Sequence, residues 1–175
     1  MKLGDKIRII NGYPFDSSEF ASGKIGYPVI KIKELKKGSV VFTKDTCYVK
    51  ENNSLKQYIV NKGDCLVALT GNPPNKGGFD AIVGRTCLYK EEAPAYLNQR
   101  VCKVESNSND LLNKYLAYFL SLVKTTINLA SRCTRSANQA NISSKDILDL
   151  EIDLPCIKIQ QHIVNTISSL LLKSL

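Results

Sequence analysis

The hydrophobic pattern of this chain changes near residue 106, and that change limits the folds open to it. Before this point, short apolar runs predict β-strands at 6–10, 27–32, 39–42, 47–50, 65–69, 81–89 and 99–105. The segments between the runs are rich in Gly, Pro and Asn, which form tight turns. This part of the sequence lacks the regular strand–helix alternation of a doubly wound parallel sheet.

Helical spacing follows. Apolar residues at 111, 112, 115, 116, 119, 122 and 123 predict one amphipathic helix over 110–129, with Asn109 or Asp110 as its N-cap. The polar stretch 131–146 predicts a loop with two arginines. Ser143 or Ser144 then starts a short helical turn, and 151–155 reads as a brief strand that Pro155 closes.

A last helix is predicted from about residue 157. Its apolar residues at 159, 163, 167, 170 and 171 lie on one helical face. Such a stripe usually packs into a core, but at the end of the sequence it indicates a partner helix. The pattern as a whole predicts an α/β fold of the mixed α+β kind, with an irregular mixed β-sheet.

The charge of the chain favours a polyanionic partner. The 175 residues carry a net charge of +8, and the sequence pI is about 9.2. Residues 1–64 hold 12 Lys/Arg against 7 Asp/Glu, residues 65–140 hold 9 against 5, and residues 141–175 hold 3 against 4. The basic part is therefore the predicted globular part, and nucleic acid is its simplest partner. The alternative is a Lys-rich, solvated surface with no ligand.

The cysteines and the N-terminus predict a cytoplasmic protein. Six cysteines occur without a C-x-x-C pair, mostly within apolar runs, as expected of free, buried thiols in a reducing compartment. The single histidine, His162, lies in the tail, so neither a zinc site nor a His-dependent nucleophile is expected. No signal peptide or membrane-spanning run is visible, and no cofactor is expected.

Residues 72–75 read Asn-Pro-Pro-Asn, close to the Asn-Pro-Pro-aromatic tetrapeptide with which adenine methyltransferases grip a flipped base. Asn75 stands where the stacking ring is needed, and the next aromatic residue is Phe79. No Gly-rich motif for S-adenosylmethionine lies upstream, and no G-K-[ST] follows for phosphate binding. The stretch therefore reads as a loop after a buried strand. A small adenine-N6 methyltransferase remains the enzymatic alternative.

Five ordered segments resemble the specificity subunit of type I restriction–modification systems, and in particular one of its target recognition domains. They are "LGDKIRIINGYPFDSSEF" (3–20), "GYPVIKIKEL" (26–35), "NKGDCLVALTG" (61–71), "AYLNQRVCKVE" (95–105) and "ANQANISSKDILDLEIDLP" (137–155). Each is weak alone, but together they cover almost the whole chain in the family's order. The family's L-P-P-L-x-E-Q is replaced here by "LPCIKIQQ", without the second Pro and the Glu.

The resemblance implies a target-recognition-domain fold at 1–155 and the start of the conserved helical, coiled-coil or dimerisation region at 156–175. It also implies a non-catalytic module that holds double-stranded DNA for a methyltransferase subunit and a restriction subunit. The C-terminal helix would join a second copy of the chain or a second recognition domain. No membrane partner is expected.

Base recognition needs forked or amide side chains on loops, such as Arg for guanine and Asn or Gln for adenine. Asn72 and Asn75 are equally well explained as turn formers, and Tyr13 and Phe15 as aromatic residues folded onto the core, the favoured reading for Phe15. The predicted DNA-binding residues are Tyr13, Lys31, Lys33, Asn72, Lys76, Arg85, Asn98, Gln99, Arg100, Arg132, Arg135, Asn138 and Gln139.

Two non-catalytic alternatives remain at the level of the sequence. An RNA-binding module would prefer single strands and stack bases on aromatic side chains. A scaffold for protein assembly would not retain duplex DNA at moderate salt.

Overall fold

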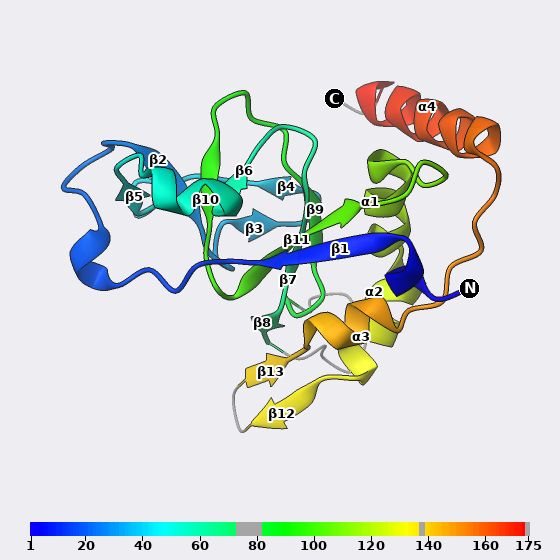
Figure 1. Cartoon of the computed structure of the whole chain (residues 1–175), viewed down its shortest axis with the longest axis horizontal. Helices are drawn as coiled ribbons and strands as arrows, with labels where there is room; N and C mark the ends of the chain where they lie inside the picture. The colour runs from blue at the N-terminus through cyan, green and yellow to red at the C-terminus, as the bar shows by residue number, and fades with distance from the viewer. Residues whose placement is uncertain (73–81, 137–138, 174–175) are drawn as a thin grey trace.

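A computed structural model describes residues 1–72, 82–136 and 139–173 (Figure 1). A central antiparallel sheet has the strand order β1 (Ile7–Asn11), β11 (Val101–Ser106), β7 (Cys65–Ala68) and β9 (Thr86–Leu88). Both faces of β7 are buried, because Cys65 and Val67 belong to one core cluster while Leu66 and Ala68 belong to another. Alternate residues of a strand point to opposite faces, so this sheet is the middle layer of the protein.

One side of the central sheet carries the helices. η1 (Leu3–Asp5), α1 (Asn113–Ser121), α2 (Val123–Ser131) and α3 (Ser144–Leu148) contribute buried residues to the first core cluster. α4 (Ile157–Lys173) lies over α1 at one end of the molecule, as Figure 1 shows. The C-terminal helix predicted from about residue 157 is therefore confirmed.

The other side is covered by a second sheet, with the strand order β5 (Tyr48–Val49), β2 (Tyr27–Ile30), β10 (Ala95–Leu97) and β6 (Ile59–Val60). β2 and β10 run parallel, and the outer pairs are antiparallel, so the sheet is mixed as predicted. A hairpin of β3 (Leu35–Lys36) and β4 (Ser39–Val40) packs on the second core cluster. The short 3-10 helices η2 (Ser17–Glu19) and η3 (Asn53–Tyr58) complete this half.

A third, small sheet joins β8 (Thr70–Gly71), β13 (Gln139–Asn141) and β12 (Thr134–Ser136). The prediction of a loop over 131–146 is therefore wrong for most of that stretch. In β13 only Ala140 is buried, so the strand shows no clear hydrophobic alternation. Figure 1 shows this sheet at the edge of the molecule opposite α4.

The single helix predicted over 110–129 is wrong. It is two helices, because Leu122 is extended, with φ −60° and ψ 137°. Leu122 and Val123 were counted in the apolar stripe but are 54% and 55% exposed. The predicted N-caps are also wrong: α1 begins at Asn113, its N-cap is Leu112, and that residue has no capping side chain.

Other boundaries differ in smaller ways. The strand predicted at 81–89 is only Thr86–Leu88, since Gly84 turns the chain at φ +75° and residue 81 lies outside the described ranges. The strand predicted at 151–155 is a single bridge between Glu151 and Lys2. The predicted helical turn at 144 is confirmed as α3, with Ser143 in a capping box with Asp146.

Candidate nucleic-acid interface

The chain between β10 and β11 makes a tight turn at residues 98–100. The main-chain N–H of Val101 donates to the carbonyl oxygen of Asn98 at 2.9 Å, and that of Asn98 donates to Ile30 at 3.1 Å. Asn98 is buried, whereas Gln99 and Arg100 are exposed. The turn thus follows the carboxyl end of the parallel pair β2–β10 and presents an amide and a guanidinium to solvent.

The first loop of the chain clamps this turn from one side. The N–H of Tyr13 donates to Leu97 at 2.8 Å, and its carbonyl oxygen accepts from Gln99 at 3.0 Å. Its ring lies 4.9 Å from Phe15 and 5.3 Å from Tyr58 between centroids. Phe15 is in the core, as favoured from the sequence, while Tyr13 is half-buried and DNA contact through its ring stays a prediction.

The third sheet adjoins the other side of the turn. The N–H of Leu69 donates to Arg100 at 2.9 Å, and the N–H of Ile142 donates to Leu69 at 2.9 Å. β8 and β13 continue from these residues, with the Thr70 hydroxyl donating to Asn141 at 2.9 Å. We call residues 98–100, β8, β12 and β13 the reading edge.

The reading edge carries several of the predicted residues. Arg135 pairs with Ala140 through the β12–β13 ladder, and Gln139 is half-buried in β13. Asn72 is exposed directly after β8. The predictions at Lys76 and Asn138 lie outside the described residues.

The remaining predicted cations are bound to protein groups. Lys31 Nζ donates to Cys47 Sγ at 3.1 Å and lies 4.1 Å from the centre of the Phe20 ring. Lys33 Nζ donates to the Asp45 carbonyl oxygen at 2.6 Å, and Arg85 donates to Leu35 at 3.0 Å. These contacts hold loops of the second sheet and of the β3–β4 hairpin. DNA contact by these three residues stays a prediction.

Arg132 has a structural partner on each side. Its Nε donates to Asn128 Oδ1 at 2.9 Å, and its guanidinium also donates to the Asp146 carbonyl oxygen at 3.2 Å. It therefore ties the end of α2 to α3. By contrast, Gln99 and Arg100 make no side-chain hydrogen bond within the ranges that the structure describes, so their donors face solvent.

A buried charged group that the sequence did not single out is Lys103 on β11. It is 7% exposed, and its Nζ lies 2.9 Å from Glu105, 3.3 Å from Asp64 and 3.0 Å from the Ile59 carbonyl oxygen. Burial alone would raise the pKa of Glu105, but hydrogen bonds from Lys103 and Arg8 outweigh it and lower that pKa. This network joins the two large sheets. Side chains alternate between the two faces of β11, and both faces are buried at residue 103. This alternation is the sequence signal that could have identified Lys103 as a buried charge.

Three of the six cysteines behave as small core residues, whereas Cys47 and Cys133 are half-buried and Cys156 is exposed. Cys65, Cys87 and Cys102 are buried and free. Burial raises the pKa of all three thiols, to about 11 for Cys87 and about 12 for Cys102, so they stay protonated. Across 1–72, 82–136 and 139–173, no group of His, Cys, Asp and Glu is arranged to hold a metal ion, and no helix is long and apolar enough to span a bilayer.

The family model for the type I restriction modification DNA specificity domain matches residues 1–174. The chain belongs to this family. The EcoBI specificity subunit of Escherichia coli is 29% identical over 163 residues, which are 93% of this chain and 30% of that protein. The EcoEI specificity subunit of the same organism is 30% identical over 112 residues, or 63% of this chain and 18% of that protein.

Solved structures of specificity subunits share the fold. The HsdS subunit from Thermoanaerobacter tengcongensis matches with a TM-score of 0.67 at 18% identity, over 99% of this chain and 37% of that one. The S subunit from M. genitalium matches with a TM-score of 0.67 at 15% identity, over 97% and 37%. The chain thus spans between 18% and 37% of the length of these relatives.

Membership of the specificity family confirms the prediction that the chain is a non-catalytic recognition module and not an adenine methyltransferase. The matched model is a DNA specificity domain, and the curated relatives are specificity subunits rather than methyltransferases. The mixed α+β fold predicted from the sequence agrees with the solved specificity subunits.

Proposed function

We propose that the chain recognises a short sequence of double-stranded DNA through the reading edge, as one target recognition domain. The observation that carries this is the turn at 98–100. Its Gln99 and Arg100 side chains are exposed, while its backbone is clamped by Tyr13 on one side and Leu69 on the other. A fixed backbone lowers the entropy cost of ordering these side chains against a base pair. Gln99 and Arg100 can therefore discriminate between bases.

The chemistry of the two side chains suits base edges in the major groove. A guanidinium can donate two parallel hydrogen bonds to guanine, and a side-chain amide can donate to and accept from adenine. Each such pair discriminates by about 1–3 kcal/mol. The net charge of +8 supplies the sequence-independent attraction to phosphates that precedes recognition.

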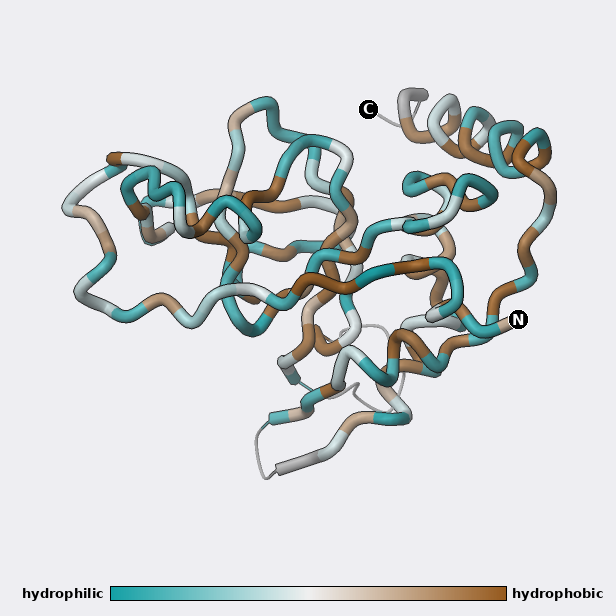
Figure 2. The backbone as a smooth tube through the Cα atoms, in the orientation of Figure 1, coloured by the Kyte–Doolittle hydropathy of each residue, from teal (hydrophilic) through white to brown (hydrophobic). Residues whose placement is uncertain are grey.

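We further propose that residues 156–175 begin the region through which the domain joins the methyltransferase and restriction subunits, with 1–155 as the recognition domain proper. Ile159 and Leu170 on α4 are 51% and 62% exposed. Figure 2 shows alternating hydrophilic and hydrophobic bands along this helix. Such a face suits a second helix, from another copy of the chain or from a second recognition domain. A DNA partner and protonated thiols are consistent with a cytoplasmic protein.

Selection from a pool of randomised duplex DNA tests the proposal. The purified chain is expected to enrich a short motif, and Gln99→Ala and Arg100→Ala are each expected to relax single positions of it. Lys158→Ala on α4 is the matched control, because Lys158 is exposed on the helix opposite the reading edge and should leave the motif unchanged. Absence of any enriched motif would contradict DNA recognition. Preference for single-stranded RNA over duplex DNA in competition would favour the RNA-binding alternative.

A further inference from the structure

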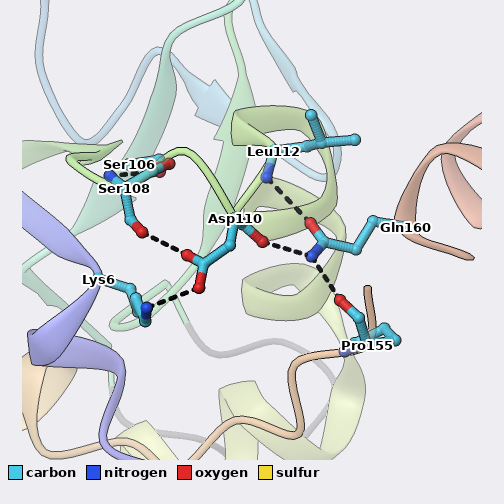
Figure 3. A network of polar contacts seen from close by, with 7 residues as sticks. All are labelled: Lys6, Ser106, Ser108, Asp110, Leu112, Pro155 and Gln160. Atoms are coloured by element: carbon cyan, nitrogen blue, oxygen red, sulfur yellow. Dashed lines mark hydrogen bonds and ion pairs between the residues drawn. The ribbon is translucent and has the colours of Figure 1, made fainter. Parts of the chain in front are cut away.

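Gln160 on α4 is fully buried, with 0% of its surface exposed. Its Oε1 accepts from the main-chain N–H of Leu112 at 3.0 Å, and its Nε2 donates to the carbonyl oxygens of Asp110 and Pro155, each at 2.7 Å (Figure 3). An amide side chain can accept at its oxygen and donate twice from its nitrogen, so both of its polar atoms are engaged.

One of these contacts takes the place of half of a capping box. The N–H of the N-cap residue is usually accepted by a Glu or Gln side chain three residues later, but α1 has Leu112 as its N-cap and Tyr115 at that position. Gln160 supplies one acceptor from a helix that comes more than forty residues later in the chain. α1 and α4 therefore share one polar contact that neither can make alone.

The segment that Gln160 holds is itself fixed to the rest of the domain. The Asp110 carboxylate pairs with Lys6 Nζ at 2.6 Å and accepts from the Ser108 hydroxyl, as Figure 3 shows. Ser108 in turn bonds with Ser106 at the end of β11. Since β11 starts directly after the turn at 98–100, one strand connects the reading edge to the Gln160 contacts.

The rest of the α4 contact is modest. Val164 is 5% exposed, and the Ser168 hydroxyl lies 3.2 Å from that of Tyr118. Residues 160, 164 and 168 are four apart, so they form the face of α4 that lies on α1. Gln160 is the member with three hydrogen bonds, and each of its partners is a main-chain group, which fixes position more closely than apolar packing does.

We propose that Gln160 is a positioning residue that fixes the direction of α4 relative to β11. It thereby sets the geometry between the reading edge and the segment that α4 engages. The effect on the geometry of the reading edge rests on the proposed function, whereas the direction of α4 relative to β11 concerns this chain alone.

Residual dipolar couplings of main-chain N–H groups test the direction of α4 in the isotope-labelled chain. In the wild type, one alignment tensor is expected to fit α4 and β11 together. In Gln160→Ala, we expect the couplings of α4 to be reduced or to require a different alignment tensor from that of β11. We also expect the Leu112 N–H to exchange with solvent at least about tenfold faster than in the wild type. Gln161→Ala is the matched control, because Gln161 is exposed and bonds only to Asn165 at 2.9 Å among the described residues.

A general loss of stability must be separated from a change of direction. Ile142 is 5% exposed and belongs to the core cluster that includes Leu116 of α1. Ile142→Val shortens this side chain and is expected to lower stability while α4 and β11 keep the wild-type alignment tensor. Unchanged α4 couplings and an unchanged Leu112 exchange rate in Gln160→Ala would overturn the proposal. Gln160→Met, which keeps the length of the side chain, serves if Gln160→Ala does not fold.

Two further outcomes close the test. If neither variant folds, the exchange rate of the Gln160 side-chain amide protons in the wild type tests the proposal. Fast exchange would show that these protons are not held in hydrogen bonds and would overturn the positioning role of Gln160. In the randomised-duplex selection, Gln160→Ala is expected to keep the wild-type motif, because the reading edge lies at the other end of β11. No dipolar-coupling result depends on DNA, so failure of DNA recognition and failure of the positioning role are distinguishable.

Discussion

The main-chain N–H of Gln99 donates to the carbonyl oxygen of Tyr13 at 3.0 Å, which joins the first loop of the chain to the turn between β10 and β11. The approach is close because residue 12 is glycine. A Cβ at Gly12 would lie 2.1 Å from the Asn98 carbonyl oxygen and 2.7 Å from that of Leu97. Both are main-chain atoms, so a side chain at residue 12 displaces one of the two segments.

Gly12→Ala is therefore expected to move the reading turn. We expect a stability loss of about 1–3 kcal/mol, as for overpacking of a tight site, and a broadened motif in duplex selection. Urea unfolding measures the first and sequencing of the selected pool the second. Gly63→Ala is the control: Gly63 has φ +94° with nothing within 4 Å of a Cβ, so it is expected to lose about 1 kcal/mol and keep the motif. If Gly12→Ala selects the same motif as the wild type, the position of the turn at 98–100 does not determine recognition.

Arg100 and Arg132 are expected to differ in what they support. Arg132→Ala removes hydrogen bonds to Asn128 and Asp146, which predicts a loss of about 0.5–1.5 kcal/mol of stability, and the DNA affinity of the folded variant tests the DNA contact predicted for Arg132. Arg100→Ala should leave the unfolding curve in place and reduce affinity for the selected motif. Equal loss of affinity for motif and unrelated duplexes would make Arg100 a phosphate contact, and a titration at two salt concentrations would then show a smaller slope.

Much of the fold was predictable because local pattern and tertiary structure agree there. β1, β7 and β11 have apolar runs bounded by turn residues, and Ser143 caps α3 as its spacing indicates. The family resemblance added the order of the segments. The break at Leu122 was not predictable, because helical spacing continues through it in the sequence.

The reading edge was predictable only in part. Side-chain chemistry identified Gln99 and Arg100 as candidates, but the sequence placed both in a strand predicted at 99–105, whereas β11 begins at Val101. Arg132 was named on the same ground, since one sequence does not reveal which guanidinium has an internal partner. β12 and β13 were missed because polar strands show no alternation. Gln160 was missed because its partners are main-chain groups brought together by the fold.

Acid stability should depend on Asp149, which lies 2.7 Å from Lys145 Nζ and 2.9 Å from Lys2 Nζ. Hydrogen bonds from Lys145 and Lys2 lower the pKa of this carboxyl from 3.8 to about 2. A folded-state pKa below the unfolded value adds stability that is present above pH 3.8 and is lost as the pH falls toward 2.

The free energy of unfolding should therefore fall less steeply between pH 4 and pH 2 in Asp149→Asn than in the wild type. Urea titrations at several pH values measure the difference, which should shrink at high salt because both partners are at the surface. Asp153→Asn, at an exposed carboxyl outside these ion pairs, is the control. Parallel pH profiles for wild type and Asp149→Asn would argue against the pairing.

The apolar face of α4 predicts self-association of the isolated chain. Ile159 and Leu170 lie on one face of α4 and are each more than half exposed, whereas Gln160 and Val164 face α1. Sedimentation velocity over a range of concentrations should show a dimer in the wild type, because a second α4 can cover this face. Leu170→Glu should shift the protein to monomer, since it places a charge in the contact. Ser169→Glu adds the same charge at the neighbouring exposed position and should leave the dimer in place. A wild-type chain that stays monomeric at all concentrations would contradict self-association through this face.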